Sequence, residues 1–194
     1  MLAPDQTQAA DAVHLTRALL DAGLEEVLRA PSAEGAVELI VRRPAVDERE
    51  VLAEAELDVV AGLVGDTWSL RGSKRTADGS SHPAMQLTVM SARVVDLVAG
   101  GDRERWPLAG DQLYVDLDLS ESNLPAGTQL ALGSAVIEVT EEPHTGCAKF
   151  SARFGREAHR FVNTREHRHL RLRGLNARVV VPGNVRAGEP IRKL

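Results

Sequence analysis

Short segments of alternating apolar and polar residues dominate the second half of the sequence. Residues 113–118 alternate in this way, which predicts a strand with one buried face. The segments 130–132 and 136–140 flank Gly133-Ser134, as expected for a tight hairpin. Short strands with few helices favour a mainly β (α+β) fold built on a closed or nearly closed β-barrel.

The other elements fit around such a barrel as a few peripheral helices and further strands. Helical spacing predicts a helix from Asp5 to Arg29, closed by Pro31. Further helices are expected over residues 91–98 and 150–161, and residues 47–61 have a helical composition; strands are expected over residues 36–42, 86–90, 170–172 and 177–181. We therefore expect an added N-terminal helical extension over residues 1–35 and a barrel domain over residues 36–194.

Composition indicates a soluble globular protein. The chain has 194 residues, of which 43% are hydrophobic and 26% are charged. No apolar run approaches the roughly 18 residues needed to span a bilayer, so no membrane attachment is expected. The single cysteine cannot form an internal disulfide, and no secretory signal pattern is present, so the expected location is cytoplasmic. The sequence leaves the oligomeric state open.

Charge is distributed unevenly along the chain. Residues 1–66 carry 5 Lys/Arg against 14 Asp/Glu, whereas residues 143–194 carry 12 against 3. The basic segment suits an anionic ligand, because guanidinium groups bind phosphate with two parallel hydrogen bonds. These arginines could equally pair with the acidic N-terminal third. With only six aromatic residues to stack on bases, nucleic-acid binding is not expected.

Cys147 is the only cysteine and follows a predicted strand. A lone cysteine is often a small buried hydrophobe, but Pro143 and Gly146 indicate a turn here. His144, Lys149 and Arg153 could supply a positive field that stabilises a thiolate. Metal binding or sulfur chemistry is therefore a reasonable hypothesis for this thiol.

Four segments occur in an order and spacing similar to one known family. They are residues 62–66 (Gly-Leu-Val-Gly-Asp), residues 123–127 with 130–133, residues 137–147 ending in Cys147, and residues 173–188. They resemble the glycine–aspartate loop, the asparagine–leucine turn, the cysteine-bearing strand and the closing segment of the MOSC domain. This domain is found at the C-terminal end of molybdenum cofactor sulfurases and in stand-alone bacterial proteins. In many stand-alone members the cysteine directly follows its proline, whereas here residues 144–146 intervene.

The resemblance implies that Cys147 ligates the molybdenum of the pterin cofactor or carries sulfur. The implied chemistry is the reduction of N-hydroxylated compounds or sulfur transfer to metal centres. His144 would tune the thiol as a second catalytic residue. Candidate cofactor-binding residues are Lys74, Arg75, Asn123, Arg153 and Arg173. A separate electron-donor or sulfur-donor protein would be needed, and a chain of this length has no room for the pyridoxal phosphate domain of the fused sulfurases.

Two alternatives compete with this interpretation. Cys147 and Arg153 have the C-x5-R spacing of cysteine-dependent phosphatases, although no glycine lies between them to help form a phosphate-cradling loop. The other alternative is a barrel that binds an anion without catalysing a reaction, because a fold does not determine a function.

Overall fold

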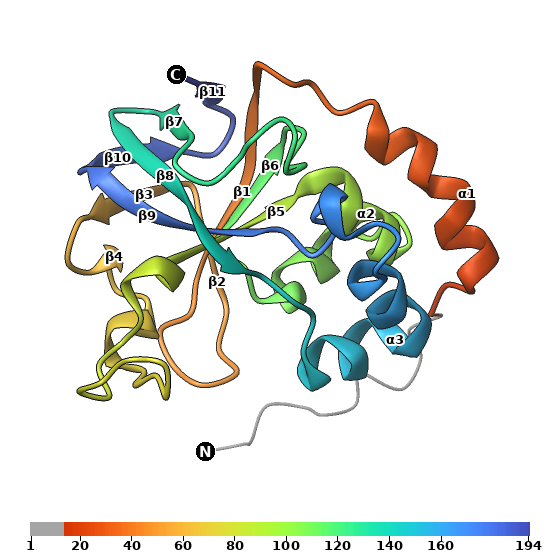
Figure 1. Ribbon diagram of the computed structural model, residues 1–194, viewed down its shortest axis with the longest axis horizontal. Coiled ribbons are helices and arrows are strands. Elements are labelled where there is room, and N and C mark those ends of the chain that lie inside the picture. Colours follow the sequence, from red (N-terminus) through yellow and green to blue (C-terminus); the bar gives the residue numbers. More distant parts are fainter. Residues whose placement is uncertain (1–13) are drawn as a thin grey trace.

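A closed β-barrel forms the centre of the computed structural model, which describes residues 14–194 (Figure 1). Strands β11-β7-β8-β9-β5-β6-β1 form the wall in that order, and β11 pairs with β1 to close it. Strand β2 extends the sheet beside β1. The strands of this sheet are β1 (Glu34–Arg42), β2 (Glu50–Leu52), β5 (Leu87–Ser91), β6 (Leu113–Asp116), β7 (Gln129–Leu132), β8 (Ala135–Pro143), β9 (Leu175–Val181) and β11 (Pro190–Lys193). The expected barrel fold is thus confirmed.

A small second sheet lies beside the barrel. It has the order β10-β3-β4, formed by β3 (Glu54–Asp58), β4 (Gly62–Leu63) and β10 (Gly183–Arg186). Residues 47–61 were expected to be helical on composition, and this expectation is wrong. Within β3, Ala55 and Leu57 are buried while the intervening glutamates are exposed, so a period of two decides the conformation.

Three α-helices of the described chain gather on one side of the barrel (Figure 1). They are α1 (Arg17–Leu28), α2 (Ala92–Ala99) and α3 (Ala148–Asn163). Because β5 and β6 run parallel, the chain must cross over between them, and α2 makes this crossover with a 3-10 helix, Arg103–Ala109. Thr16 caps α1 by accepting a hydrogen bond from Leu19 N–H. The expected helical residues 5–13 lie outside the described chain.

Two apolar clusters stabilise this arrangement. One fills the barrel, and the other lies between the barrel wall and the helices. In β6, Leu113 and Val115 point into the barrel cluster, whereas Tyr114 belongs to the outer cluster and is fully buried. The strand is therefore covered on both faces, and not on one face as its alternation predicted. Leu20 of α1 is also fully buried in the outer cluster.

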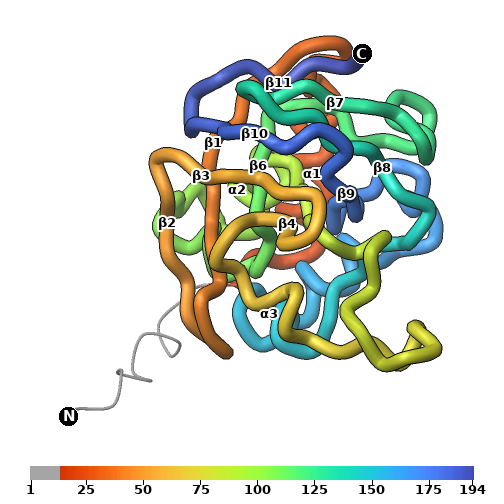
Figure 2. Tube along the Cα trace, turned by 90° about the vertical axis from the view of Figure 1, so that its left-hand side faces the viewer, coloured from red at the N-terminus to blue at the C-terminus, as the bar shows by residue number. Residues whose placement is uncertain are grey.

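One end of the barrel collects the segments that carry the candidate site. Figures 1 and 2 show the start of α3 and the segment between β4 and β5 at the same end, opposite the C-terminus. Residues 170–172, expected as a strand, instead form the end of a 3-10 helix and a turn, because Arg171 adopts a left-handed conformation (φ 48°). Within residues 14–194, no helix is long and apolar enough to cross a membrane.

Candidate functional site

Cys147 lies in the short loop that joins β8 to α3. The strand ends at Pro143, and Cys147 is the N-cap residue of the helix, in an extended conformation. Its side chain is exposed and forms no disulfide. The strand therefore delivers the thiol to the surface at the end of the barrel.

Gly146, the residue before the cysteine, is held by side chains from the far end of α3. Its N–H donates to Asn163 Oδ1 at 2.9 Å, and its carbonyl oxygen lies 3.0 Å from His159 Nε2. In a straight helix the rise of about 1.5 Å per residue would leave residue 163 roughly 25 Å from residue 146. Gly155 breaks the helix with a left-handed φ of 90°. This break allows the second half of α3 to reach the loop.

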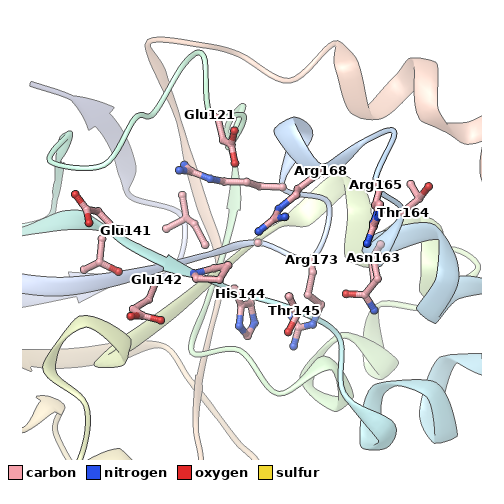
Figure 3. Close-up of a pocket in the computed structure, with 16 residues that line it drawn as sticks. Glu121, Glu141, Glu142, His144, Thr145, Asn163, Thr164, Arg165, Arg168 and Arg173 are labelled. Atoms are coloured by element: carbon pink, nitrogen blue, oxygen red, sulfur yellow. The ribbon is translucent and has the colours of Figure 1, made fainter. Parts of the chain in front are cut away.

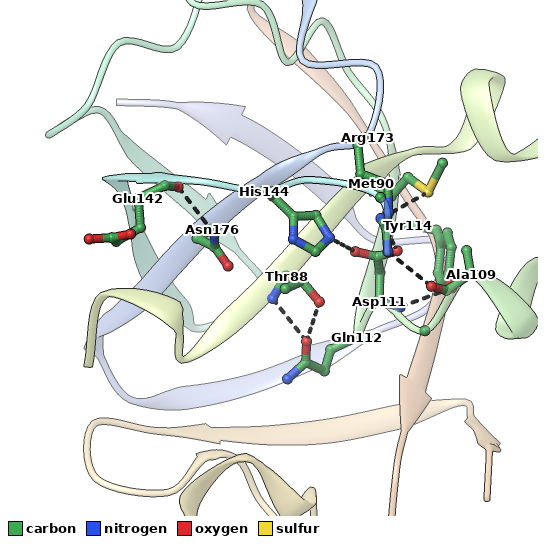
Figure 4. A network of polar contacts seen from close by, with 12 residues as sticks. Thr88, Met90, Ala109, Asp111, Gln112, Tyr114, Glu142, His144, Arg173 and Asn176 are labelled. Atoms are coloured by element: carbon green, nitrogen blue, oxygen red, sulfur yellow. Dashed lines mark hydrogen bonds and ion pairs between the residues drawn. The ribbon is translucent and has the colours of Figure 1, made fainter. Parts of the chain in front are cut away.

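His144 begins the same loop and is held by a buried carboxylate (Figure 4). Its Nε2 lies 2.9 Å from Asp111 Oδ1, while Asp111 Oδ2 accepts a hydrogen bond of 2.6 Å from Arg173 Nη1. Arg173 Nη2 donates to the Ala109 carbonyl at 2.9 Å. The guanidinium also lies over the Phe150 ring, 5.0 Å from its centroid. The loop is therefore fixed at both His144 and Gly146.

Burial and neighbouring charge determine the protonation of this group. Burial alone would raise the pKa of Asp111, but the charge of Arg173 and the hydrogen bonds from His144 and Arg173 outweigh it and lower that pKa. Burial, reinforced by the charge of Arg173, lowers the pKa of His144. At neutral pH Asp111 is thus a carboxylate and His144 is neutral, with Nε2–H donating to Asp111. Nδ1 makes no hydrogen bond to any residue of 14–194 and is not among the buried unpaired atoms, so it is open to a ligand.

A cavity of about 390 Å³ opens beside the loop (Figure 3). Its lining comes from the end of β8, the start of β9 and the segment between α3 and β9. The charged lining residues are His144, Arg165, Arg168, Arg171, Arg173, Glu121, Glu141 and Glu142. Thr145, two residues before the cysteine, also lines it. His144 and Thr145 of the loop are therefore part of the cavity wall, whereas Cys147 itself is not in the lining.

The structure brings together only some of the residues predicted from sequence. His144 and Arg173 share Asp111 and line the cavity. Arg75 pairs with Glu142 at the cavity rim, and the neighbouring Lys74 is exposed.

The remaining two predicted residues, Arg153 and Asn123, make contacts elsewhere. Arg153 donates to the Leu108 carbonyl at 2.9 Å and to Asp47 at 2.9 Å. Asn123 donates to the carbonyl oxygens of Ser32 and Asp118. Neither residue is in the cavity lining, and their proposed roles in cofactor binding stay predictions.

The glycine–aspartate loop has a clear structural role. Asp66 accepts hydrogen bonds from the Arg43 guanidinium at 2.8 Å through each of its oxygens, and it also binds the N–H groups of Arg43 and Trp68. Gly65 adopts a left-handed φ of 83°, which suits glycine at this turn. The motif thus anchors the start of the long loop after β4 to the end of β1.

The C-x5-R spacing does not form a phosphate-cradling loop. All residues from Ala148 to Arg153 are helical, and they begin α3. Their N–H groups therefore all point along the helix axis. They do not converge on one point, as the N–H groups of a phosphate-cradling loop do. The geometry gives no support to a phosphatase of this type.

Sequence reasoning missed several residues of the site. Asp111 follows a glycine in a connection, with no motif around it. Asn163 and His159 lie on a helix whose kink at Gly155 could not be read from spacing alone. A usable signal was present for Arg165 and Arg168, because both lie in the basic segment at residues 143–194. The segment contains many arginines, however, and the sequence did not indicate which of them face a cavity.

Comparison with known proteins extends this description. A family model described as "MOSC domain" matches residues 80–192. The YuaD protein from Bacillus subtilis superposes with a TM-score of 0.58 at 18% identity, covering 82% of this chain and 95% of YuaD. YiiM from Escherichia coli superposes with a TM-score of 0.52 at 21% identity, covering 82% of this chain and 69% of YiiM. None of the curated proteins matches the sequence. The two solved structures show the shared fold.

Proposed function

The chain belongs to the MOSC domain family, and on that premise we propose that it binds the molybdenum cofactor, or carries sulfur, through Cys147. The observation that carries this proposal is the setting of the thiol. The only cysteine is exposed, and the loop before it is fixed by Asp111 and Asn163 beside an arginine-lined cavity. A reactive thiol needs access and a defined position, and both are present.

The residues present fit the implied group. Thiolate is a soft ligand suited to metals that bind sulfur. Within residues 14–194, no cluster of three or more His, Cys, Asp or Glu side chains could hold a metal ion. A metal that arrived bound to its pterin would need only one protein ligand, and the Cys147 thiolate could supply it. When bound, this cofactor supplies the redox chemistry at the metal, and Cys147 would be the residue that holds it.

His144 has the properties of a proton acceptor in the same site. It is neutral because its pKa is lowered by burial, and Asp111 fixes the tautomer with the proton on Nε2. Nδ1 can then accept the proton that a thiol or a bound substrate loses. Asp111 is a positioning residue, because it orients the imidazole of His144 and a ligand does not need to contact it.

Two chemistries remain within this proposal. Cys147 would hold the metal in the reduction of N-hydroxylated compounds, with electrons from a separate donor protein. Alternatively, its thiolate would attack the outer sulfur of a persulfide on a donor protein, release the donor's thiol and become the persulfide from which sulfur passes to a metal centre. Both use the same exposed thiol. A barrel that binds an anion without reaction is the second candidate function, and the arginine-lined cavity is the observation that favours it.

The proposal is tested with Cys147→Ser, purified from a host that makes the cofactor. We expect molybdenum and pterin in the wild type and in Ser151→Ala, a control one turn further along α3, and a loss of both in Cys147→Ser. For the sulfur-carrier form, intact-mass spectrometry after treatment with a sulfur donor should show added sulfur in the wild type only. Unchanged metal, pterin and sulfur loading in Cys147→Ser would refute the role of the thiol. A wild type that carries none of them would favour the non-catalytic barrel.

A further inference from the structure

The cavity wall between α3 and β9 contains two arginines, Arg165 and Arg168, that were not among the cofactor-binding residues predicted from the sequence. We infer that Arg165 and Arg168, with Arg173 behind them, form the binding site for a phosphate monoester. This inference rests on the proposed function and deepens it, because it assigns to these residues the phosphate group of the ligand that would bind beside the cysteine loop.

The first observation is that two of the four arginines that line the cavity have no side-chain partner. Arg153, Arg160, Arg173 and Arg178 each pair with a carboxylate. In the described residues, by contrast, neither Arg165 nor Arg168 forms an ion pair or a side-chain hydrogen bond, although both line the cavity. A guanidinium without a partner can turn its forked donors toward phosphate oxygens.

Arg173 supplies a second, independent observation. Its side chain is only 5% exposed, and its two terminal nitrogens donate to Asp111 and to the Ala109 carbonyl. Its Nε is buried and has no hydrogen-bond partner in the described chain. Buried donors are rarely left unpaired, so an unsatisfied donor in a cavity lining needs an explanation. Arg173 lines the cavity, so a small shift of its side chain would let an oxygen of a bound anion satisfy this donor.

The opposite side of the cavity limits where an anion can bind. Figure 3 shows Glu141 and Glu142 on the side of β8, across from Arg165 and Arg168. Glu142 is paired with Arg75, whereas Glu141 has no cationic partner among residues 14–194. Carboxylates repel phosphate, so Glu141 and Glu142 disfavour an anion on the β8 side. Glu121 also lines the cavity, where its charge acts on Arg171, so the anion is expected nearer to Arg165, Arg168 and Arg173. The volume of about 390 Å³ exceeds the need of a free phosphate ion and falls in the range of small-molecule sites, which favours a phosphate carried by a larger ligand.

Calorimetric titration of the cofactor-free protein at low salt tests this site, with inorganic phosphate and ribose 5-phosphate as probes. Arg165→Ala/Arg168→Ala should weaken binding of both probes by at least about 10-fold, because it removes charge-assisted hydrogen bonds. The matched control Arg156→Ala/Arg160→Ala removes the same charge from α3, outside the cavity lining, and should change affinity less than about 2-fold. Glu141→Gln should tighten binding, since it removes a repulsive charge.

Several outcomes would overturn the inference. One is an equal loss of affinity in the two double variants, which would indicate diffuse attraction by the whole basic segment. Another is weaker binding of phosphate to Glu141→Gln. The third is the absence of saturable binding of either probe to the wild type. Circular dichroism confirms that each variant is folded.

Cys147→Ser separates this inference from the proposed function. Phosphate binding should persist in Cys147→Ser even where molybdenum is lost. Phosphate binding by a wild type that carries neither pterin nor added sulfur would support the anion site while refuting the proposed function. Pterin content of Arg165→Ala/Arg168→Ala distinguishes the sources of the phosphate. A loss of pterin identifies the cofactor's own phosphate, whereas normal pterin with lost phosphate binding identifies a separate phosphate monoester.

Discussion

Two arginine–aspartate pairs are buried in the described chain, and they differ in what they leave available. In the Arg43–Asp66 pair, all three guanidinium nitrogens have acceptors, namely the two Asp66 oxygens and the Gly110 carbonyl. In the Arg173–Asp111 pair, Arg173 Nε has no partner and Asp111 also binds His144. In the first pair every guanidinium nitrogen has its hydrogen-bond acceptor within the protein, so the pair acts as a structural connection. The second keeps hydrogen-bonding capacity at a cavity, which is expected of a site that binds something else.

The comparison also separates two aspartates that each follow a glycine in the sequence. Asp66 ends the segment that resembles the glycine–aspartate loop of the MOSC domain, and its contacts are structural. Asp111 lies in an unremarked connection and orients the one histidine of the cysteine loop. A sequence motif can thus serve the structure of the barrel, whereas a residue outside any motif can belong to the functional site.

Removal of either aspartate should cause the largest effect and test whether the two pairs are equivalent in stability. Asp66→Ala and Asp111→Ala each leave a buried guanidinium without its carboxylate, so each should lower the free energy of unfolding by about 3–5 kcal/mol. Urea unfolding at neutral pH measures this. A loss below about 1 kcal/mol in either variant would show that its arginine finds water, and that the pair is not buried as described.

The same two variants should differ at the thiol. Alkylation of Cys147 by iodoacetamide should change in rate in Asp111→Ala, because His144 loses its anchor, and should match the wild type in Asp66→Ala. An equal change in both variants would mean that general loosening, and not the link through His144, controls the thiol.

Releasing Gly146 from its contact with Asn163 should have a smaller effect on the free energy of unfolding. In Asn163→Ala the half-buried Gly146 N–H loses its acceptor, which should cost about 1–2 kcal/mol of unfolding free energy. The alkylation rate of Cys147 should rise, since the loop gains freedom. Arg156→Ala, an exposed change on the same helix, should stay within about 0.5 kcal/mol of the wild type. Equal behaviour of the two variants would remove the proposed role of α3 in fixing the loop.

The pH dependence of stability should show the smallest effect. The pKa of His144 is lowered below its usual value of 6.5 in the folded protein, so the unfolded chain binds more protons as pH falls through and below that value. The contribution of neutral His144 is therefore complete above pH 6.5 and is lost as pH falls toward the folded pKa. Thermal unfolding from pH 7.5 to 5.5 should show a steeper loss of Tm in the wild type than in His144→Gln. Parallel curves would contradict a lowered pKa.

Sequence patterns predicted the barrel because strands such as β7 and β8 obey a period of two. The helix at residues 92–99 and the position of the cysteine after β8 also depend on signals that are local in the sequence. Where composition and period disagreed, as in β3, the period was the better guide.

The site was less predictable because its contacts join segments far apart in the chain. Asp111 meets His144 across 33 residues and Arg173 across 62. The kink at Gly155, a single residue, brings Asn163 to the loop. No spacing rule covers such contacts, so the predicted set contained His144 and Arg173 but not the carboxylate that joins them.

The most direct test of the account is the accessibility of Cys147 in protein that carries molybdenum. Because Cys147 is the only cysteine, every alkylation event reports on this thiol. Intact-mass spectrometry after a pulse of iodoacetamide, with molybdenum measured in the same sample, gives both quantities together. If Cys147 holds the cofactor, the alkylated fraction should fall in proportion to the molybdenum bound, and should recover when the cofactor is removed. Equal alkylation of loaded and cofactor-free protein would contradict the account.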